Sequence, residues 1–138
     1  MLKLLPLADI LKLSEEELTL LTGETGLDTG TAALAVQGPA LILISLAERG
    51  AYFRRGALCG LVPAFQVDTV DTTGAGDAFW GGMLSQMRFR GVTRAEQLTE
   101  PLVQEALEYG NVSGWLCVQG RGAIPSLPTR QEIERYLV

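Results

Sequence analysis

The apolar run ALILISL at residues 40–46 most narrowly limits what this 138-residue chain can fold into. A strand that is apolar on both sides is normally covered on both faces of a sheet. Helical patterns flank the run, at about 28–37 and 75–89. Strands and helices in this order predict a layered α/β domain with a largely buried sheet.

Shorter signals predict the remaining elements. Residues 8–14 resemble a strand that enters a helix, because Ser14 and Glu17 have capping-box spacing and Gly23 can end that helix. Asp28 or Thr29 could cap the helix at 28–37. After the central strand, the segments AYFRR, GALCGLV and FQVDTV predict strands of a meander. Later helices are expected at about 75–89, with Phe79, Met83 and Met87 on one face, and at 101–118 and 128–137.

Composition excludes several classes of function. The chain has no histidine, so it cannot build a Ser-His-Asp triad, a Cys-His pair or a histidine zinc site. Its net charge is −5 with scattered Lys and Arg, which argues against nucleic acid or an anionic membrane as the main partner. Cys59 and Cys117 fit two buried apolar residues in a reducing cytoplasm. Pro6 and Asp9 interrupt the apolar start, so we expect neither a signal peptide nor a membrane span.

The stretch DTVDTTGAGDAFWGG at 68–82 carries the chemistry. A glycine-rich turn before a helix presents backbone N–H groups at the positive end of the helix dipole, where phosphate or an oxyanion can bind. Gly74 and Gly76 allow close approach, and Asp77 in the first helical turn could accept a proton from a hydroxyl beside the anion. The alternatives are a tight turn with Asp77 as a dipole partner, and, for Gly81 and Gly82, close packing of the helix on the sheet.

The segment DTTGAGDAFWGG resembles the C-terminal signature of the ribokinase-like (PfkB) family of ATP-dependent carbohydrate kinases. ADILKLSEEELTLLTG, LILISLAERGAYF and GAIPSLPT resemble other blocks of that family in the same order, and most resemble those of fructokinases. The resemblance covers essentially the whole chain. It implies the C-terminal portion of a three-layer, Rossmann-like α/β fold with helices on both faces of the sheet.

The resemblance also implies roles for individual residues. Asp77 matches the catalytic base, and the amides of Gly74, Ala75 and Gly76 match the anion hole for the transferred phosphoryl group. Glu17 matches the acidic residue that helps to hold magnesium through water. Asp71, the Thr73 carbonyl, Ser126 and the backbone near Gly122 match a monovalent-cation site, for which K⁺ is a candidate. Two further sets match the nucleotide loop (Ser45, Ala47, Gly50) and the adenine pocket (Asn111, Gly114).

Two positions depart from the family pattern. Ser14 stands where Asn is usual in the family, although fructokinase-like members also tend to have Ser there. Ala47 stands where Gly is usual, so its methyl group could crowd the nucleotide. Two matched residues also have structural alternatives. Glu17 could serve only the capping box, and Asn111 could be a buried helix residue satisfied by a neighbouring carbonyl.

The resemblance is to the C-terminal half of a family member. The N-terminal half, which supplies most of the sugar pocket and the lid, is absent from this sequence. We therefore expect one nucleotide-binding and catalytic domain over residues 1–138, either part of a longer kinase or paired with another copy or chain. The expected activity is transfer of the ATP γ-phosphate to a small sugar, with Mg²⁺. A nucleoside or 2-keto-3-deoxygluconate kinase and a truncated, non-catalytic nucleotide-binding or scaffold protein remain open alternatives.

Overall fold

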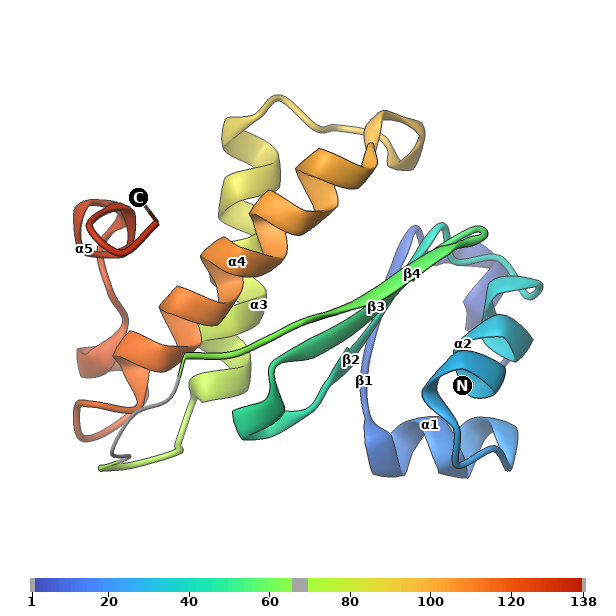
Figure 1. The fold of residues 1–138 in the computed structure, drawn as a ribbon, viewed down its shortest axis with the longest axis horizontal. Coiled ribbons are helices and arrows are strands. Elements are labelled where there is room, and N and C mark those ends of the chain that lie inside the picture. Colours follow the sequence, from blue (N-terminus) through green and yellow to red (C-terminus); the bar gives the residue numbers. More distant parts are fainter. Residues whose placement is uncertain (1, 66–69, 138) are drawn as a thin grey trace. The chain divides into compact units, whose positions relative to one another are not determined.

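The structure, a computed structural model, describes residues 2–65 and 70–137. The chain forms two compact units. The first unit comprises Met1–Val62 with Arg94–Leu98, and the second comprises Pro63–Thr93 with Thr99–Val138. Figure 1 labels their helices and strands. Among the described helices, none has both the length and the apolar composition needed to cross a bilayer.

The first unit is a sheet with helices packed on it. Its elements are η1 (Leu2–Leu7), β1 (Ile10–Ser14), α1 (Glu15–Thr22), α2 (Leu27–Ala35), β2 (Leu41–Ser45), η2 (Ala47–Arg49), β3 (Ala51–Arg55), β4 (Leu58–Val62) and η3 (Ala95–Gln97), where η marks a short 3-10 helix. The strand order is β1-β2-β3-β4, parallel between β1 and β2 and antiparallel at the other two pairings. Helices α1 and α2 lie on one face of the sheet (Figure 1).

Strand β2 confirms the prediction made from ALILISL. It is an internal strand of the sheet, and its residues Leu41, Ile42, Leu43 and Ile44 are all 0% exposed. Ile42 and Ile44 pack with Leu34 of α2 and Leu18 of α1 in one apolar cluster. The alternate residues face the other side of the sheet, because side chains along a strand alternate between faces.

Helix α1 begins and ends as predicted. The Ser14 hydroxyl accepts the Glu17 N–H at 3.2 Å, and the Glu17 carboxylate accepts the Ser14 N–H at 2.8 Å. The helix then ends at Gly23, which has the left-handed conformation (φ 76°) that favours glycine.

The predicted cap of α2 is wrong. Gly26 is the N-cap and makes no side-chain capping bond. The Asp28 carboxylate instead forms an ion pair with Arg54 of β3, and the Arg54 Nε donates to the Thr31 hydroxyl at 2.9 Å. Arg54 is only 8% exposed, so these partners satisfy a nearly buried cation and join α2 to the sheet.

Cys59 also differs from expectation. Its side chain is half-buried, with Sγ 3.5 Å from the Asp28 carboxylate, whereas Cys117 is 1% exposed as predicted. Both thiols are free.

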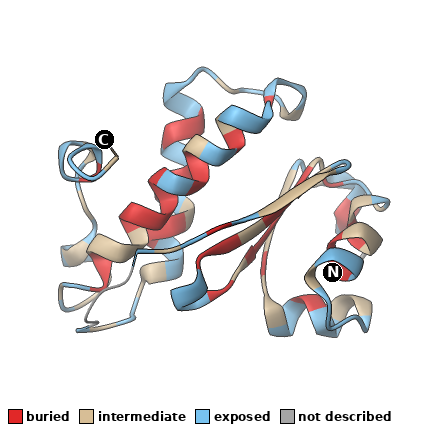
Figure 2. Ribbon diagram, viewed as in Figure 1, coloured by how far each residue is buried: buried red, intermediate tan, exposed pale blue. Residues whose placement is uncertain are grey.

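The second unit is a helical pair with a C-terminal segment. Its elements are α3 (Ala75–Phe89), α4 (Glu100–Cys117), η4 (Ile124–Ser126) and α5 (Arg130–Glu134). The predicted bounds of α3 are confirmed, and Phe79, Met83 and Met87 are buried on its inner face. Figure 2 shows buried residues along both long helices. The segment predicted as a strand at 65–70 lies mostly outside the described residues.

Glycines bring α3 and α4 close together. A Cβ placed on Gly82 would lie 2.6 Å from the Ser113 Cβ, and one on Gly110 would lie 2.8 Å from the Phe79 carbonyl oxygen. Gly82 therefore packs on α4, and the expected packing of this helix on the sheet stays a prediction. Gly81 faces open space, because a Cβ there would meet no described atom within 4 Å.

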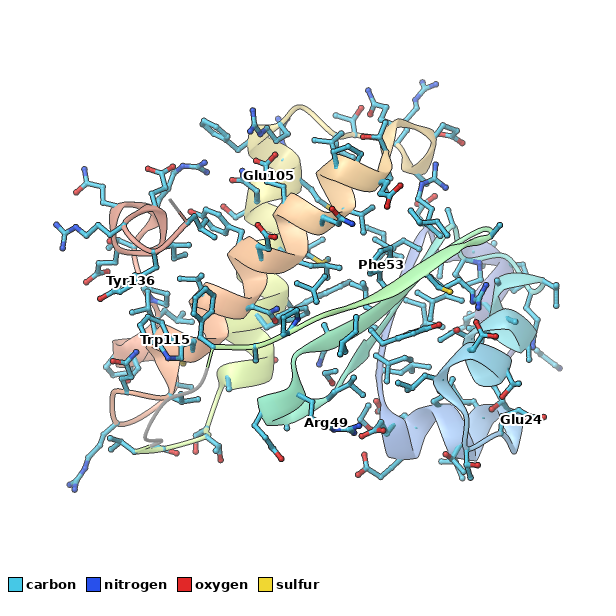
Figure 3. The ribbon with its side chains drawn as sticks, in the orientation of Figure 1. Glu24, Arg49, Phe53, Glu105, Trp115 and Tyr136 are labelled. Carbon is cyan, nitrogen blue, oxygen red and sulfur yellow. The ribbon has the colours of Figure 1, made fainter. Side chains whose placement is uncertain are left out.

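Helix α5 is shorter than predicted, and its start is capped by Thr129, whose hydroxyl accepts the Glu132 N–H. It is held to α3 by Arg130, whose guanidinium lies 3.5 Å from the centre of the Phe89 ring and donates to the Gln86 side chain at 2.9 Å. Just beyond α5, Tyr136 packs edge-on against Trp115 of α4, with ring centres 4.7 Å apart (Figure 3). Together these contacts fix the C-terminal segment on the helical pair.

Candidate active site

The glycine-rich turn leads directly into α3. Gly74 has φ 82°, a left-handed conformation that an L side chain adopts only with strain, and α3 starts at the next residue. A Cβ on Gly74 would lie only 2.5 Å from the Ala123 Cβ. Both the conformation and this contact therefore require glycine, and Asp77 follows as an exposed residue of the first helical turn.

Asp71 connects the turn to the segment after α4. One oxygen of its carboxylate accepts the Thr73 N–H at 2.9 Å, and the other accepts the Gly122 N–H at 3.1 Å. The hydrogen bonds from Thr73, and then that from Gly122, lower the Asp71 pKa to about 2. Asp71 is therefore ionised at neutral pH and links the two segments as an anion.

Cys117 lies beneath the same turn. Its Sγ is 3.9 Å from the Thr73 carbonyl oxygen and 4.0 Å from the Ala123 carbonyl oxygen. Burial, followed by the negative charges of Asp71 and Asp77, raises the pKa of this thiol. Cys117 is therefore a neutral, weak donor that faces two carbonyl acceptors.

The predicted cation residues fit a hard cation by their chemistry. The Asp71 carboxylate, the Thr73 carbonyl and the Ser126 hydroxyl all offer oxygen. Ionised Asp71 keeps free lone pairs after accepting two N–H groups, because a carboxylate has about four acceptor positions. Ser126 packs against Gly120, where a Cβ would lie 2.2 Å from the Ser126 Oγ. Among the residues that the structure describes, three or more His, Cys, Asp or Glu side chains nowhere gather as a metal-binding group.

Two of the three predicted anion-hole amides, those of Ala75 and Gly76, differ in their bonding. The Ala75 N–H donates to the Thr72 carbonyl at 3.2 Å, a long bond that closes the turn. Gly76 is in the first turn of α3, where amides have no partner four residues back within the helix. The turn can therefore present donors to an anion at the positive end of α3, which fits the phosphate groups of a nucleotide.

The first unit holds the other predicted nucleotide and magnesium residues. The Glu17 carboxylate takes part in the capping box, which is the structural alternative named above, and its role toward magnesium stays a prediction. The Ser45 hydroxyl donates to the Leu13 carbonyl at 3.2 Å and so joins β2 to β1.

The predicted nucleotide loop contains an unusual backbone conformation. Ala47 has φ 52° and is the only non-glycine with positive φ among the described residues. Gly50, with φ 100° and ψ −134°, has a conformation almost restricted to glycine. Glycine would adopt the backbone conformation of position 47 without strain. Close by, Arg49 forms an ion pair with Glu15 at the start of α1 (Figure 3).

Asn111 and Gly114 lie on α4. The Asn111 side-chain amide donates to the Pro63 carbonyl at 3.0 Å and is 6% exposed, which is the structural alternative for this residue. Gly114 packs on α3, where a Cβ would lie 3.2 Å from the Ala75 carbonyl oxygen. Their assignment to an adenine pocket stays a prediction.

Sequence reasoning did not identify Ala123 or Gly120 as neighbours of the site, and it assigned Cys117 only to the core. No local pattern marks these residues, because the bond between Asp71 and Gly122 spans 51 positions and the contact between Cys117 and Thr73 spans 44. The one sequence signal for a contact in this segment was the pair Gly120 and Gly122, since glycines allow close approach of the backbone.

The chain matches the family model described as pfkB family carbohydrate kinase over residues 1–130. It is 34% identical over 136 residues to a fructokinase of Vibrio alginolyticus, with 99% of this chain and 43% of that protein covered. It is 38% identical over 131 residues to probable fructokinase-4 of Arabidopsis thaliana, with 94% and 39% covered. The chain thus spans less than half the length of these relatives.

Solved structures show the same fold. A fructokinase double mutant of Vibrio cholerae O395, bound to fructose, ADP and a potassium ion, matches with TM-score 0.87 and 30% identity over 99% of this chain and 43% of that one. Aminoimidazole riboside kinase of Salmonella enterica, bound to aminoimidazole riboside and an ATP analogue, matches with TM-score 0.83 and 34% identity over 99% and 44%. The chain therefore has a ribokinase-like α/β fold and belongs to the pfkB family of carbohydrate kinases.

Proposed function

We propose that this chain is the nucleotide-binding and catalytic part of an ATP-dependent carbohydrate kinase of the fructokinase type. The observation that carries the proposal is the glycine-rich turn, which is held between Asp71 and Ala123 at the start of α3 and is followed by Asp77. Such a turn supplies backbone donors and a carboxylate side by side. Transfer of a phosphoryl group to an alcohol needs both.

In the proposed reaction, Asp77 accepts the proton of a sugar hydroxyl whose oxygen attacks the γ-phosphorus of ATP. The bond from that phosphorus to the β,γ-bridging oxygen breaks, and ADP leaves. The amides of Gly74, Ala75 and Gly76 stabilise the negative charge on the transferred group. Glu17 would help to hold Mg²⁺ through water, and Asp71, Thr73 and Ser126 would hold a monovalent cation such as K⁺. These ions neutralise phosphate charge when bound.

The rest of the site belongs to the same proposal. Ser45, Ala47 and Gly50 would form the nucleotide loop, and Asn111 and Gly114 would border the adenine. The sugar pocket would come from the part of the family fold that these residues do not span, either on a longer polypeptide or on a partner chain. We also propose that the protein lies in the cytoplasm, because both of its cysteines are free thiols, as is usual in a reducing compartment.

Replacement of Asp77 by Asn tests the proposal. Calorimetry with ATP on this chain should show binding that Asp77→Asn retains. Phosphorylation assays across ketoses, nucleosides and 2-keto-3-deoxygluconate, on this chain and on any longer polypeptide that contains it, should show turnover that Asp77→Asn abolishes. Glu108→Gln, an equivalent change at an exposed position of α4, should leave turnover intact.

The outcomes separate the alternatives. Normal turnover by Asp77→Asn would exclude Asp77 as the base. Turnover with a nucleoside or a keto-deoxy acid alone would change the substrate class and keep the mechanism. ATP binding without turnover in any longer polypeptide would indicate a nucleotide-binding or scaffold protein.

A further inference from the structure

The thiol of Cys117 contacts both segments that build the glycine-rich turn. Its Sγ lies 3.9 Å from the Thr73 carbonyl oxygen on one side and 4.0 Å from the Ala123 carbonyl oxygen on the other. Thr73 directly precedes Gly74, and Ala123 is the residue against which Gly74 packs. One side chain therefore contacts both the segment that leads into the turn and the segment that packs against it.

The packing leaves little room for a side chain of another size at position 117. Cys117 is 1% exposed. The two segments that it contacts already pack tightly against each other, since a Cβ on Gly74 would lie 2.5 Å from the Ala123 Cβ. Protein interiors are close-packed, so added volume is accommodated only by movement of neighbouring atoms. A larger residue at 117 must therefore displace the segment at Thr73, the segment at Ala123, or both.

The chemistry of the thiol adds a directional preference. A neutral thiol has one S–H donor, and here it faces two carbonyl acceptors. Asp71 fixes the same two segments from its own position, through the N–H groups of Thr73 and Gly122. The thiol of Cys117 and the carboxylate of Asp71 therefore contact the same two segments. The thiol contacts their carbonyl oxygens, and the carboxylate accepts their N–H groups.

We propose that Cys117 is a positioning residue for the glycine-rich turn, because its volume and its S–H donor set the orientation in which the turn presents its amides to a phosphate. The role in phosphate binding rests on the function proposed above. The role in positioning does not, and it can be tested without a ligand.

The first experiment compares glycine amide resonances of the 138-residue protein labelled at its 16 glycines. Cys117→Val should move the resonances of Gly74, Gly76 and Gly122 and leave those of Gly23 and Gly56, which lie in the first unit. Cys117→Ser, which keeps a hydrogen-bond donor in a slightly smaller side chain, should move them less than Cys117→Val does. Cys59→Val is the matched control, because it makes the same change in a half-buried strand of the first unit.

A folded Cys117→Val protein in which these three resonances stay in place would overturn the proposal. If the valine variant does not fold, Cys117→Ala gives the same decision, since it removes both the donor and part of the volume. Its three resonances should then move, and unchanged positions would again overturn the proposal.

The second experiment measures ATP and AMP binding by calorimetry. Because the turn would contact the terminal phosphate, Cys117→Val should weaken ATP binding about tenfold and AMP binding less than about twofold. Equal loss for both nucleotides would mean general damage and would overturn the positioning role. If wild-type protein binds neither nucleotide, the proposed function fails, and the glycine resonances still decide the role of Cys117.

Discussion

The carboxylate of Asp71 accepts the backbone N–H of Gly122 at 3.1 Å, across 51 positions of the chain. The other oxygen of the same carboxylate accepts the Thr73 N–H, so one anion joins the segment before α3 to the segment after α4. This bridge joins two segments that border the candidate anion site.

Replacement of Asp71 by Asn should lower stability in a manner that depends on pH. The folded-state pKa of Asp71 is depressed to about 2 from an ordinary value of 3.8, so its stabilisation is complete above 3.8 and is lost as pH falls through about 2. The stability difference between wild type and Asp71→Asn should therefore shrink across this interval. Urea unfolding followed by tryptophan fluorescence measures it, because Trp80 and Trp115 both lie in the second unit. A difference that stays constant from neutral pH down to about pH 2 would contradict the bridge.

Ala47→Gly should stabilise the first unit. Ala47 has φ 52°, where an L residue is strained by about 1 kcal/mol that glycine avoids. Thermal unfolding followed by circular dichroism should show a higher Tm. Ala57→Gly is the control, because Ala57 is an exposed turn residue without positive φ, and glycine there should lower the Tm through chain entropy. Equal effects of the two changes would argue against strain at Ala47.

The adjacent glycines of α3 should respond oppositely to alanine. Gly81→Ala should stabilise the second unit by about 1 kcal/mol, because its Cβ would meet no described atom within 4 Å and alanine favours helix. Gly82→Ala should destabilise it by about 2 kcal/mol, because its Cβ would lie 2.6 Å from the Ser113 Cβ. Tryptophan fluorescence in urea compares the two. The double variant Gly82→Ala with Ser113→Gly should recover part of the loss, and no recovery would place the cause elsewhere.

Trp115→Phe should cost little stability. None of the described residues accepts the buried Trp115 indole N–H, and its ring packs against Tyr136 at 4.7 Å and Phe65 at 5.6 Å between centres. Phenylalanine keeps aromatic packing and removes the unsatisfied donor, so we expect a change below about 1 kcal/mol, against a loss of about 3 kcal/mol for Trp115→Ala. Urea unfolding followed by the remaining Trp80 signal measures both. A Phe variant as unstable as the Ala variant would show that the indole N–H has an acceptor.

The sequence by itself determined the features that depend on near neighbours. The run at 40–46 specified a buried internal strand, because apolar residues at successive positions must be covered on both faces. Ser14, Glu17 and Gly23 determined the bounds of α1, since capping bonds join residues a few positions apart. The DTTGAGD segment also showed where the candidate site lies and which family the chain resembles.

Only the tertiary structure decided which distant residues meet. The pairing of Asp28 with Arg54 replaced the predicted helix cap, and Gly82 faces Ser113 of α4. Cys117 likewise contacts Thr73 and Ala123 at the glycine-rich turn, although Thr73 lies far from it in the sequence. These contacts depend on how whole elements pack, and packing is set by the shapes of surfaces formed only after the chain has folded, so no short sequence pattern encodes them.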